Sequence, residues 1–370
     1  MKEIKSILNL YESVKEGNER AAIAQVVRVE ESSYRREGAR MLVFESGVFE
    51  GGISGGCLEG DALKRSQMAI LKQQPSVVTY DTSKDDENQI GVGLGCNGII
   101  DVLISPINQE NKIIPILKKC LAERKAHAIV TVTELNGAAE NLGLGDMFYL
   151  DLQSRKMEDC SSKELEGFVE NQLDDILDKK RSRILHMETD AFRAKIFVEL
   201  LPAQFHLAIY GDNYDVYPML DLAKVMDWDV SLVGNLQKLK KEKLRDVKNL
   251  YPKDSAKRPS IDNRTAVVLM AHDFKTDTNN LKNLLDSEAP YIACLGPRKR
   301  YEKMLNSVEK EGFFLSEVQE ERVFAPCGLE IGANTPEEIA ASVFTEILSV
   351  FSNKKGGMLR DKVGPIHERY

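Results

Sequence analysis

The sequence predicts a two-domain α/β protein, with a mixed α/β N-terminal domain and a C-terminal doubly wound, Rossmann-like domain. Three observations predict this fold. The chain has 370 residues, which is too long for one typical core. The strand predicted at 196–200 ends at Pro202, and apolar strands and helical patterns alternate after it. The first of these strands runs directly into Gly211, as βαβ units begin. We therefore expect domains at 1–202 and 203–353, followed by a polar tail at 354–370.

Composition excludes several classes of protein. Hydrophobic residues make up 42% of the chain, which is ordinary for a globular protein, and no apolar run is long enough to span a membrane. The net charge of −8 argues against general nucleic-acid binding. The 6 cysteines show no CxxC spacing, which argues against a zinc ribbon, an iron–sulfur cluster or a disulfide scaffold. Residues 1–17 lack the features of a secretory signal, so we expect a cytoplasmic protein.

The first domain is expected to open with an amphipathic helix at 1–17. Further helices are predicted at 61–72 and 113–124, and a capping box formed by Ser161 and Glu164 predicts another to residue 178. His127 is predicted to lie at the surface. Gly47 marks a hairpin turn. Strands are predicted at 21–30, 41–44, 77–80, 99–104, 128–132 and 196–200.

The second domain shows the alternation typical of a parallel sheet. After the first strand, a helix is expected to run through Leu220 to Met226. The lysine-rich stretch 238–258 is predicted to be an exposed helix and loop. Thr335, Pro336 and Glu338 predict the start of the last helix by a cap, a first-turn proline and an acidic residue. Strands are predicted at 206–210, 230–233, 265–270 and 291–295.

Two glycine-rich runs, each with one cysteine, are the sharpest signal in the chain. The first is GGISGGCLEGD at 51–61, and the second is GVGLGCNG at 91–98. Glycine lets the backbone approach a ligand closely, and N–H groups at a helix start attract anions. A single run of this kind is more often a tight turn beside a buried thiol, but two together favour a ligand site, with a structural pair as the alternative. The candidate ligand-binding residues are Ser54, Gly55, Gly56, Cys57, Glu59, Gly95, Cys96 and Asn97.

Three arginines precede the first glycine run. Arg35, Arg36 and Arg40 lie in or next to a polar loop that ends at Gly38. Guanidinium groups pair with phosphate oxygens, so this loop is a candidate site for an acidic ligand. A solvated loop face is an equally good interpretation of the same residues.

The second domain carries a damaged dinucleotide fingerprint. Gly211 occupies the first glycine position, but Asn213 and Val216 occupy the second and third. Gly234 and Asn235 stand where an acidic ribose partner is expected, which argues against tight NAD binding. Residues that follow strand ends are ligand candidates, although a helix cap and an exposed helix face are alternatives for two of them. The candidates are Gly211, Asn213, His272, Asp273, Gly296 and Arg298.

Several of these motifs together resemble the xanthine dehydrogenase accessory (XdhC/CoxI) proteins. The similarity spans nearly the whole chain, and the combination of motifs is specific. Two positions depart from the family pattern, because Gly211-Asp212-Asn213 replaces GAG and Gly234-Asn235 lacks the usual acid. The motifs are SSYRREGARMLV (32–43), the two glycine–cysteine runs, RTAVVLMAHD (264–273), YIACLGPRKR (291–300) and GLEIGANTPEEIA (328–340).

The resemblance implies a protein that binds molybdenum cofactor, protects its sulfurated form and assists insertion into a molybdenum hydroxylase such as xanthine dehydrogenase. It implies an XdhC/CoxI-type first domain, a Rossmann-type second domain and a homodimer. The implied partners are the hydroxylase apoenzyme and a cysteine desulfurase or sulfurase as sulfur donor. Some family members are called dehydrogenase subunits.

The residues suit this cofactor chemically. The cofactor is an anionic pterin with a phosphate and a sulfur-bound metal. A thiolate is a soft ligand for such a metal or for a persulfide, and arginines suit the phosphate. We therefore expect Cys57 and Cys96 at the molybdenum end, with Arg35, Arg36 and Arg40 at the anionic end. A nicotinamide-dependent oxidoreductase and a partner-binding module without cofactor are the alternatives.

Overall fold

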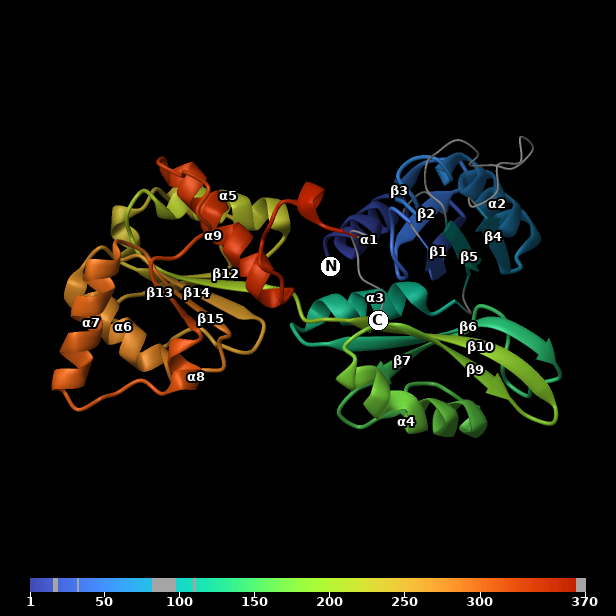
Figure 1. Ribbon diagram of the computed structural model, residues 1–370. Coiled ribbons are helices and arrows are strands. Elements are labelled where there is room, and N and C mark those ends of the chain that lie inside the picture. Colours follow the sequence, from blue (N-terminus) through green and yellow to red (C-terminus); the bar gives the residue numbers. More distant parts are fainter. Residues whose placement is uncertain (16–18, 32, 82–97, 109–110, 364–370) are drawn as a thin grey trace. The chain divides into compact units, whose positions relative to one another are not determined.

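The computed structural model of the chain describes residues 1–15, 19–31, 33–81, 98–108 and 111–363 (Figure 1). The described residues form two compact units, which divide between Ala203 and Gln204. Each unit has its own sheets and its own cores. No helix in the described ranges is long and apolar enough to cross a membrane.

The N-terminal unit contains two antiparallel sheets. The first has the order β3-β2-β1-β5-β4 and the second the order β8-β7-β6-β10-β9. β2 and β3 form the hairpin predicted around Gly47, whose φ of 91° suits a glycine turn. The first sheet consists of β1 (Ala21–Glu31), β2 (Arg40–Phe44), β3 (Phe49–Gly51), β4 (Ser76–Asp81) and β5 (Gly98–Ile107). The second consists of β6 (His127–Gly137), β7 (Met147–Asp151), β8 (Lys156–Met157), β9 (Arg183–Glu188) and β10 (Phe192–Leu201).

Four helices pack against these two sheets and form layers with them (Figure 1). α1 (Lys2–Lys15) and α3 (Ile113–Ala122) share one core with both sheets. α2 (Glu59–Lys72) covers the other face of the first sheet, and α4 (Lys163–Asp178) covers the other face of the second. Alternate residues of β10 show the division, because Phe197 belongs to the shared core whereas Ile196 and Val198 pack on the α4 side. The two sheets are therefore parts of one folding unit.

The C-terminal unit is a Rossmann-like fold, as predicted. Its parallel six-stranded sheet has the order β13-β12-β11-β14-β15-β16, which in sequence order reads 3-2-1-4-5-6. The strands are β11 (His206–Tyr210), β12 (Asp229–Gly234), β13 (Asn249–Pro252), β14 (Thr265–Leu269), β15 (Tyr291–Cys294) and β16 (Val323–Phe324). Because β11 and β14 are neighbours, the strand order reverses between them, and the strand ends near this point line the usual ligand crevice.

Helices cover both faces of this sheet, which confirms the doubly wound class. One face packs against α5 (Val216–Met226) and α9 (Pro336–Phe351). The other packs against α6 (Phe274–Leu284) and α7 (Arg298–Lys310), and the short α8 (Glu317–Glu320) follows them along the chain. Thr335 and Glu338 form the predicted capping box of α9, with Pro336 in its first turn. Three 3₁₀ helices lie at Leu236–Lys238, Lys241–Leu244 and Leu359–Asp361.

Three local predictions are wrong. The side chain of Ser162, not that of Ser161, caps α4 by accepting the Leu165 N–H. The stretch 238–258 contains the edge strand β13 in addition to short helices and loops. His127 is buried, because its ring lies next to Tyr149 and Nδ1 is 2.9 Å from the Tyr149 hydroxyl. Burial lowers the pKa of His127, which is consistent with a neutral ring in the interior.

Candidate functional site

The glycine–cysteine loop before α2 is held by two side chains, Ser54 and Glu59. Glu59 Oε1 accepts the backbone N–H of Ile53 at 3.2 Å and of Ser54 at 2.8 Å, and Oε2 accepts the Ser54 hydroxyl at 2.5 Å. Ser54 Oγ in turn accepts the N–H groups of Gly56 at 3.3 Å and Leu58 at 3.1 Å. The helix therefore begins with its own glutamate folded back over the loop, which fixes the backbone around Cys57.

The Cys57 thiol lies at the edge of this hydrogen-bonded turn. It is half-buried, and its Sγ donates to Ser54 Oγ at 3.4 Å. The backbone around it is thus fixed while part of the side chain stays accessible. A fixed, partly accessible thiol is suited to hold a soft group such as a thiol-bound metal or a persulfide sulfur.

Glu59 gives the loop a pH dependence. Burial favours the protonated carboxyl, but hydrogen bonds from the Ser54 hydroxyl and from the N–H groups of Ser54, Glu59 and Ile53 outweigh it and lower the pKa of Glu59. Because the pKa is lowered on folding, the carboxylate stabilises the loop above the ordinary glutamate value of 4.5. This stabilisation is lost as the pH falls through the lowered pKa.

We therefore expect Glu59→Gln to loosen the loop at neutral pH. Its amides at 53–58 are expected to exchange hydrogen about tenfold faster than those of the wild type, because hydrogen bonds to a charged acceptor are lost. As the pH falls below the ordinary glutamate range, the two proteins should converge. Hydrogen exchange followed by mass spectrometry, compared at each pH, measures this difference. Equal exchange rates at neutral pH would show that Glu59 does not hold the loop.

Tyr34 joins the glycine–cysteine loop to the arginine loop. A Cβ placed on Gly55 would lie 3.2 Å from Tyr34 Cγ, so the tyrosine ring packs directly on the glycine. The residue Tyr34 is nevertheless 77% exposed. Tyr34 is not among the residues predicted for the site, although it stands immediately before Arg35 in the loop. Its exposed ring is a surface on which a planar heterocycle can stack.

The three arginines of the adjacent loop have different roles. Arg35 pairs with Glu3 of α1. Arg36 is exposed, and within the described ranges its guanidinium has no ion-pair partner. Arg40 is buried and forms a bidentate pair with Glu199 of β10, with Nη1 3.0 Å from Oε1. Tyr34, Arg35, Arg36 and Arg40 line one cleft of about 700 Å³.

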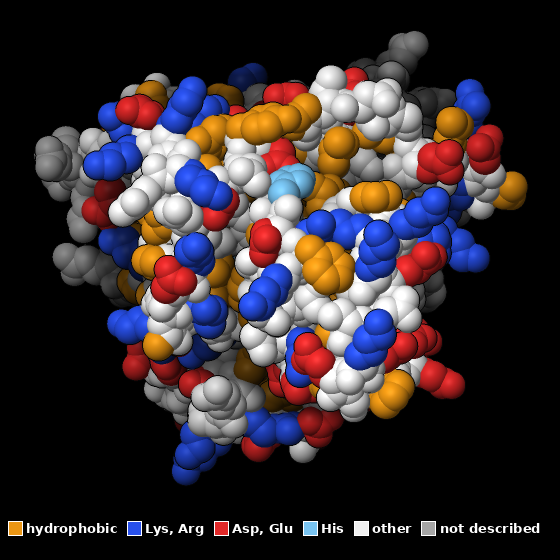
Figure 2. All heavy atoms as spheres, turned by 90° about the vertical axis from the view of Figure 1, so that its left-hand side faces the viewer, with side chains coloured by type: hydrophobic (Ala, Val, Ile, Leu, Met, Phe, Trp, Pro, Cys, Tyr) orange, Lys and Arg blue, Asp and Glu red, His pale blue; other side chains and the backbone are white. Residues whose placement is uncertain are grey.

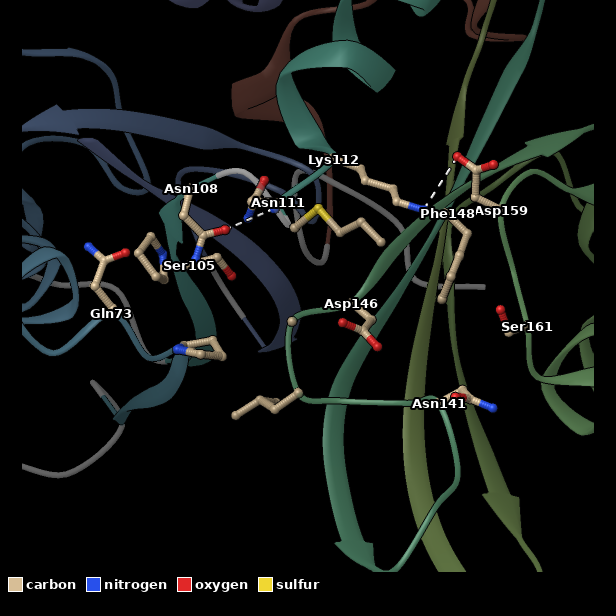
Figure 3. A pocket seen from close by; sticks show the side chains of 15 residues that line it. Gln73, Ser105, Asn108, Asn111, Lys112, Asn141, Asp146, Phe148, Asp159 and Ser161 are labelled. Carbon is tan, nitrogen blue, oxygen red and sulfur yellow. Dashed lines mark hydrogen bonds and ion pairs between the residues drawn. The ribbon is translucent and has the colours of Figure 1, made fainter. Parts of the chain in front are cut away.

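A second hollow in this unit is smaller than the cleft beside Tyr34 and is lined by other residues. It has a volume of about 300 Å³, and its described lining residues include none of those predicted for a site. Figure 3 shows Lys112 directed at Asp159, and the two side chains pair at 3.3 Å. Its lysine is thus already matched by a carboxylate. We assign no function to this hollow.

The crevice of the C-terminal unit contains only part of the predicted residues. Gly211 and Asp273 line a pocket of about 430 Å³ at the ends of β11, β12 and β14. Gly211 is needed for packing, since a Cβ there would lie 2.7 Å from Met270 Cγ. Asp273 caps α6 by accepting a hydrogen bond from the Thr276 N–H at 2.8 Å. The pKa of Asp273 is lowered, mainly by the hydrogen bond from the Thr276 hydroxyl.

The other candidates of this unit lie outside the lining of that pocket. His272 has a left-handed backbone with φ of 57°, and its Nε2 is 2.5 Å from Asp215 Oδ2. Asn213 Nδ2 donates to the Ala271 carbonyl at 3.5 Å. Gly296 has φ of 124°, as a glycine turn permits, and Arg298 is exposed at the start of α7.

The second glycine–cysteine run cannot be placed with the first. Gly95, Cys96 and Asn97 lie outside the described residues. Over the residues that are described, no group of three or more His, Cys, Asp and Glu side chains is arranged to hold a metal ion. The pairing of Cys57 with Cys96 therefore stays a prediction.

Comparisons with known proteins agree with the resemblance described above. The model of the XdhC and CoxI family matches residues 14–81, and the model of the XdhC Rossmann domain matches residues 207–347. The chain is 26% identical to a probable xanthine dehydrogenase subunit of Bacillus subtilis (strain 168), over 92% of this chain and 96% of that protein. It is 21% identical to the molybdenum cofactor insertion chaperone PaoD of Escherichia coli (strain K12), over 89% of this chain and 83% of that protein.

A solved structure shows the same fold over nearly the whole chain. A crystal structure of a xanthine dehydrogenase from Bacillus halodurans aligns with a TM-score of 0.72 and 25% identity, covering 95% of this chain and 97% of that chain. The two family models match opposite ends of the chain, one in each compact unit. The chain therefore belongs to the XdhC and CoxI family.

Proposed function

We propose that this protein binds molybdenum cofactor in its N-terminal unit and assists its insertion into the apoenzyme of a xanthine dehydrogenase-type molybdenum hydroxylase. The relative PaoD is named as an insertion chaperone for molybdenum cofactor, and this name supports the choice of cofactor. The Bacillus subtilis relative is named as a probable xanthine dehydrogenase subunit, and this name supports a xanthine dehydrogenase-type enzyme as the client. A sulfuration step, with a cysteine desulfurase or sulfurase as donor, belongs to the same proposal, as do a homodimeric state and a cytoplasmic location.

One observation carries the assignment of the site. Tyr34 links the Cys57 loop to the exposed Arg36 guanidinium. Its ring packs on Gly55 of that loop, and the residue lines the same cleft as Arg36. They supply a soft ligand, an aromatic surface and a cation, which are the three groups that a metal-bound, phosphorylated pterin requires.

In this proposal each residue has one task. Arg36 binds the phosphate, and Arg35 joins it by leaving its partly buried partner Glu3. Tyr34 stacks on the pterin. Cys57 faces the metal end, and Ser54 and Glu59 hold its backbone. Arg40 stays with Glu199 and fixes the loop. When bound, the cofactor supplies the redox-active molybdenum centre that the client enzyme uses.

Tyr34→Ala is expected to weaken cofactor binding about tenfold, or about 1.4 kcal/mol, because one stacking contact is lost. Tyr34→Phe should bind like the wild type, since it keeps the ring. Phe314→Ala removes an aromatic side chain that is 71% exposed in the other unit and is the matched control. Equilibrium dialysis with pterin fluorescence measures the affinities. Equal affinities for Tyr34→Ala and wild type would remove Tyr34 from the site.

The insertion step is tested by activating a client enzyme. Cofactor-free molybdenum hydroxylase is mixed with free cofactor or with cofactor-loaded protein, and its substrate oxidation is followed over time. We expect faster activation with the loaded protein, and loss of this advantage for Cys57→Ala but not for Cys160→Ala, which removes another half-buried thiol of the same unit. If free cofactor activates the client equally fast, the protein is not an insertion factor for that client.

A further inference from the structure

The C-terminal unit contains a pocket with more positive charge than its carboxylates neutralise. Besides Gly211 and Asp273, its lining includes Lys238, Lys253 and Arg258. The two lysines and the arginine come from the stretch 238–258 between β12 and β14, for which the sequence predicts an exposed helix and loop. The pocket has the size of a small ligand site, at about 430 Å³.

The hydrogen bonds and ion pairs of these charged side chains show which cations of the pocket are neutralised. Asp212 Oδ1 accepts the Lys238 ammonium at 2.8 Å, and its Oδ2 accepts the Asn235 N–H at 2.9 Å. Asp273 is used by Thr276 as the cap of α6. Asp212 therefore neutralises one of the three cations, whereas Asp273 keeps its negative charge, and the nearby Lys253 is among the groups that lower the Asp273 pKa.

Lys253 and Arg258 are the cations of this pocket that form no ion pair with a carboxylate among the described residues. The Arg258 guanidinium donates to backbone carbonyls, among them Lys257 O at 3.0 Å and Lys253 O at 3.1 Å, so its position is fixed while its charge is not neutralised. Lys253 follows β13 directly, and its backbone N–H donates to Gly234 O at 2.9 Å. Over the described ranges, its ammonium forms no ion pair. Both cations thus sit on anchored backbone beside the ends of β12 and β13.

The usual phosphate position of this fold is unfavourable in this chain. A dinucleotide places its pyrophosphate at the helix that follows the first strand, here α5. The carboxylate of Asp215 lies at that helix start, with Oδ2 on His272 Nε2 and with Oδ1 buried without a partner among the described residues. A negative charge there repels an anion. The incomplete glycine fingerprint and the Asp215 carboxylate both make the turn after β11 a poor phosphate site.

Charge on the surface alone does not identify the site. Figure 2 shows the C-terminal unit with Lys and Arg side chains mixed with Asp and Glu side chains over the visible face. Such a face has no continuous basic stripe for a nucleic-acid backbone. The excess of positive charge inside a pocket is therefore a more specific feature than the surface charge.

We infer that this pocket binds a small phosphorylated ligand of the nucleoside monophosphate class, with the phosphate on Lys253 and Arg258 instead of at the glycine turn. The sugar side would lie toward Asp212 and the ends of β11 and β12. This inference goes beyond the proposed function and uses none of its residues.

The test is calorimetric titration of the full-length, cofactor-free chain with AMP, CMP, adenosine, cytidine and inorganic phosphate at low ionic strength. We expect a monophosphate to bind and its nucleoside to bind at least about tenfold more weakly, since the phosphate contacts are charge-assisted. Lys253→Gln combined with Arg258→Gln should weaken the monophosphate by about tenfold or more. Lys257→Gln, an exposed neighbour outside the lining, is the matched control.

Three results would overturn the inference. They are no binding of any monophosphate, equal binding of nucleoside and monophosphate, or binding unaffected by the double variant. Binding of inorganic phosphate as tight as that of AMP and CMP would reject the nucleoside part and leave an anion site. Because the titration uses protein without cofactor, none of these results bears on the Cys57 loop.

Discussion

Glu199→Ala is expected to lower the free energy of unfolding of the N-terminal unit by about 3–5 kcal/mol, because it leaves the buried Arg40 without its counter-charge. The side chains of Arg40 and Glu199 are 2% and 3% exposed. Gln25 Nε2 also donates to Glu199 Oε2 at 3.0 Å, so β1 and β2 both lose the acceptor that β10 supplies. The pair joins β2 of the first sheet to β10 of the second, and its loss should affect both.

Urea unfolding measures this change, and the chain offers an internal reference. The sole tryptophan in the sequence, Trp228, is buried in the C-terminal core, so its fluorescence follows that unit. Far-UV circular dichroism follows both units. We expect the variant to shift the circular dichroism transition and leave the fluorescence transition in place. Glu45→Ala, which breaks an exposed pair with Arg20, should change neither noticeably. An unshifted transition in Glu199→Ala would mean that Arg40 does not depend on Glu199.

The separate variant Phe197→Ala is expected to lower the free energy of unfolding by about 3–5 kcal/mol, because it opens a cavity in the core between the sheets. Phe197 is fully buried and belongs to the cluster that contains α1, α3 and strands of both sheets. Since this core is shared, we expect faster hydrogen exchange in β1 as well as in β10.

Exchange measured by mass spectrometry distinguishes a shared core from two separate ones. Arg193→Ala, an exposed position on the same strand, should leave the exchange of β1 unchanged. If Phe197→Ala accelerates exchange only in the second sheet, the two sheets are independent and the layered description of this unit fails.

The C-terminal fold was predictable because its strands are short, continuous apolar runs. β11 and β14 are buried along their whole lengths, so each strand reads as an unbroken hydrophobic segment followed by a glycine or a polar turn. β13 escaped prediction because it is a four-residue edge strand with alternating exposure that ends in Pro252. The cap of α4 was misplaced by one residue because Ser161 and Ser162 are adjacent and only the backbone conformation selects between them.

The residues of the candidate site could be selected from the sequence only where they are close together along the chain. The Cys57 loop and the arginine loop could be read from local composition, since glycines, a thiol and guanidinium groups each suggest a chemistry. The role of Arg40 could not, because its partner Glu199 is 159 positions away and comes from another sheet. The burial of His127 depends likewise on Tyr149, a residue of the neighbouring strand. Contacts of this kind leave no periodic signal.

The most direct test of the central claim is the pterin content of the protein purified from a molybdenum-replete host. The released pterin is assayed by fluorescence in wild type, in Cys57→Ala and in the thiol control Cys160→Ala. We predict stoichiometric pterin in the wild type and in Cys160→Ala, and its loss in Cys57→Ala. If the wild type carries no pterin, even after incubation with added cofactor, or if Cys57→Ala retains as much as the wild type, the assignment of a cofactor site to the Cys57 loop is wrong.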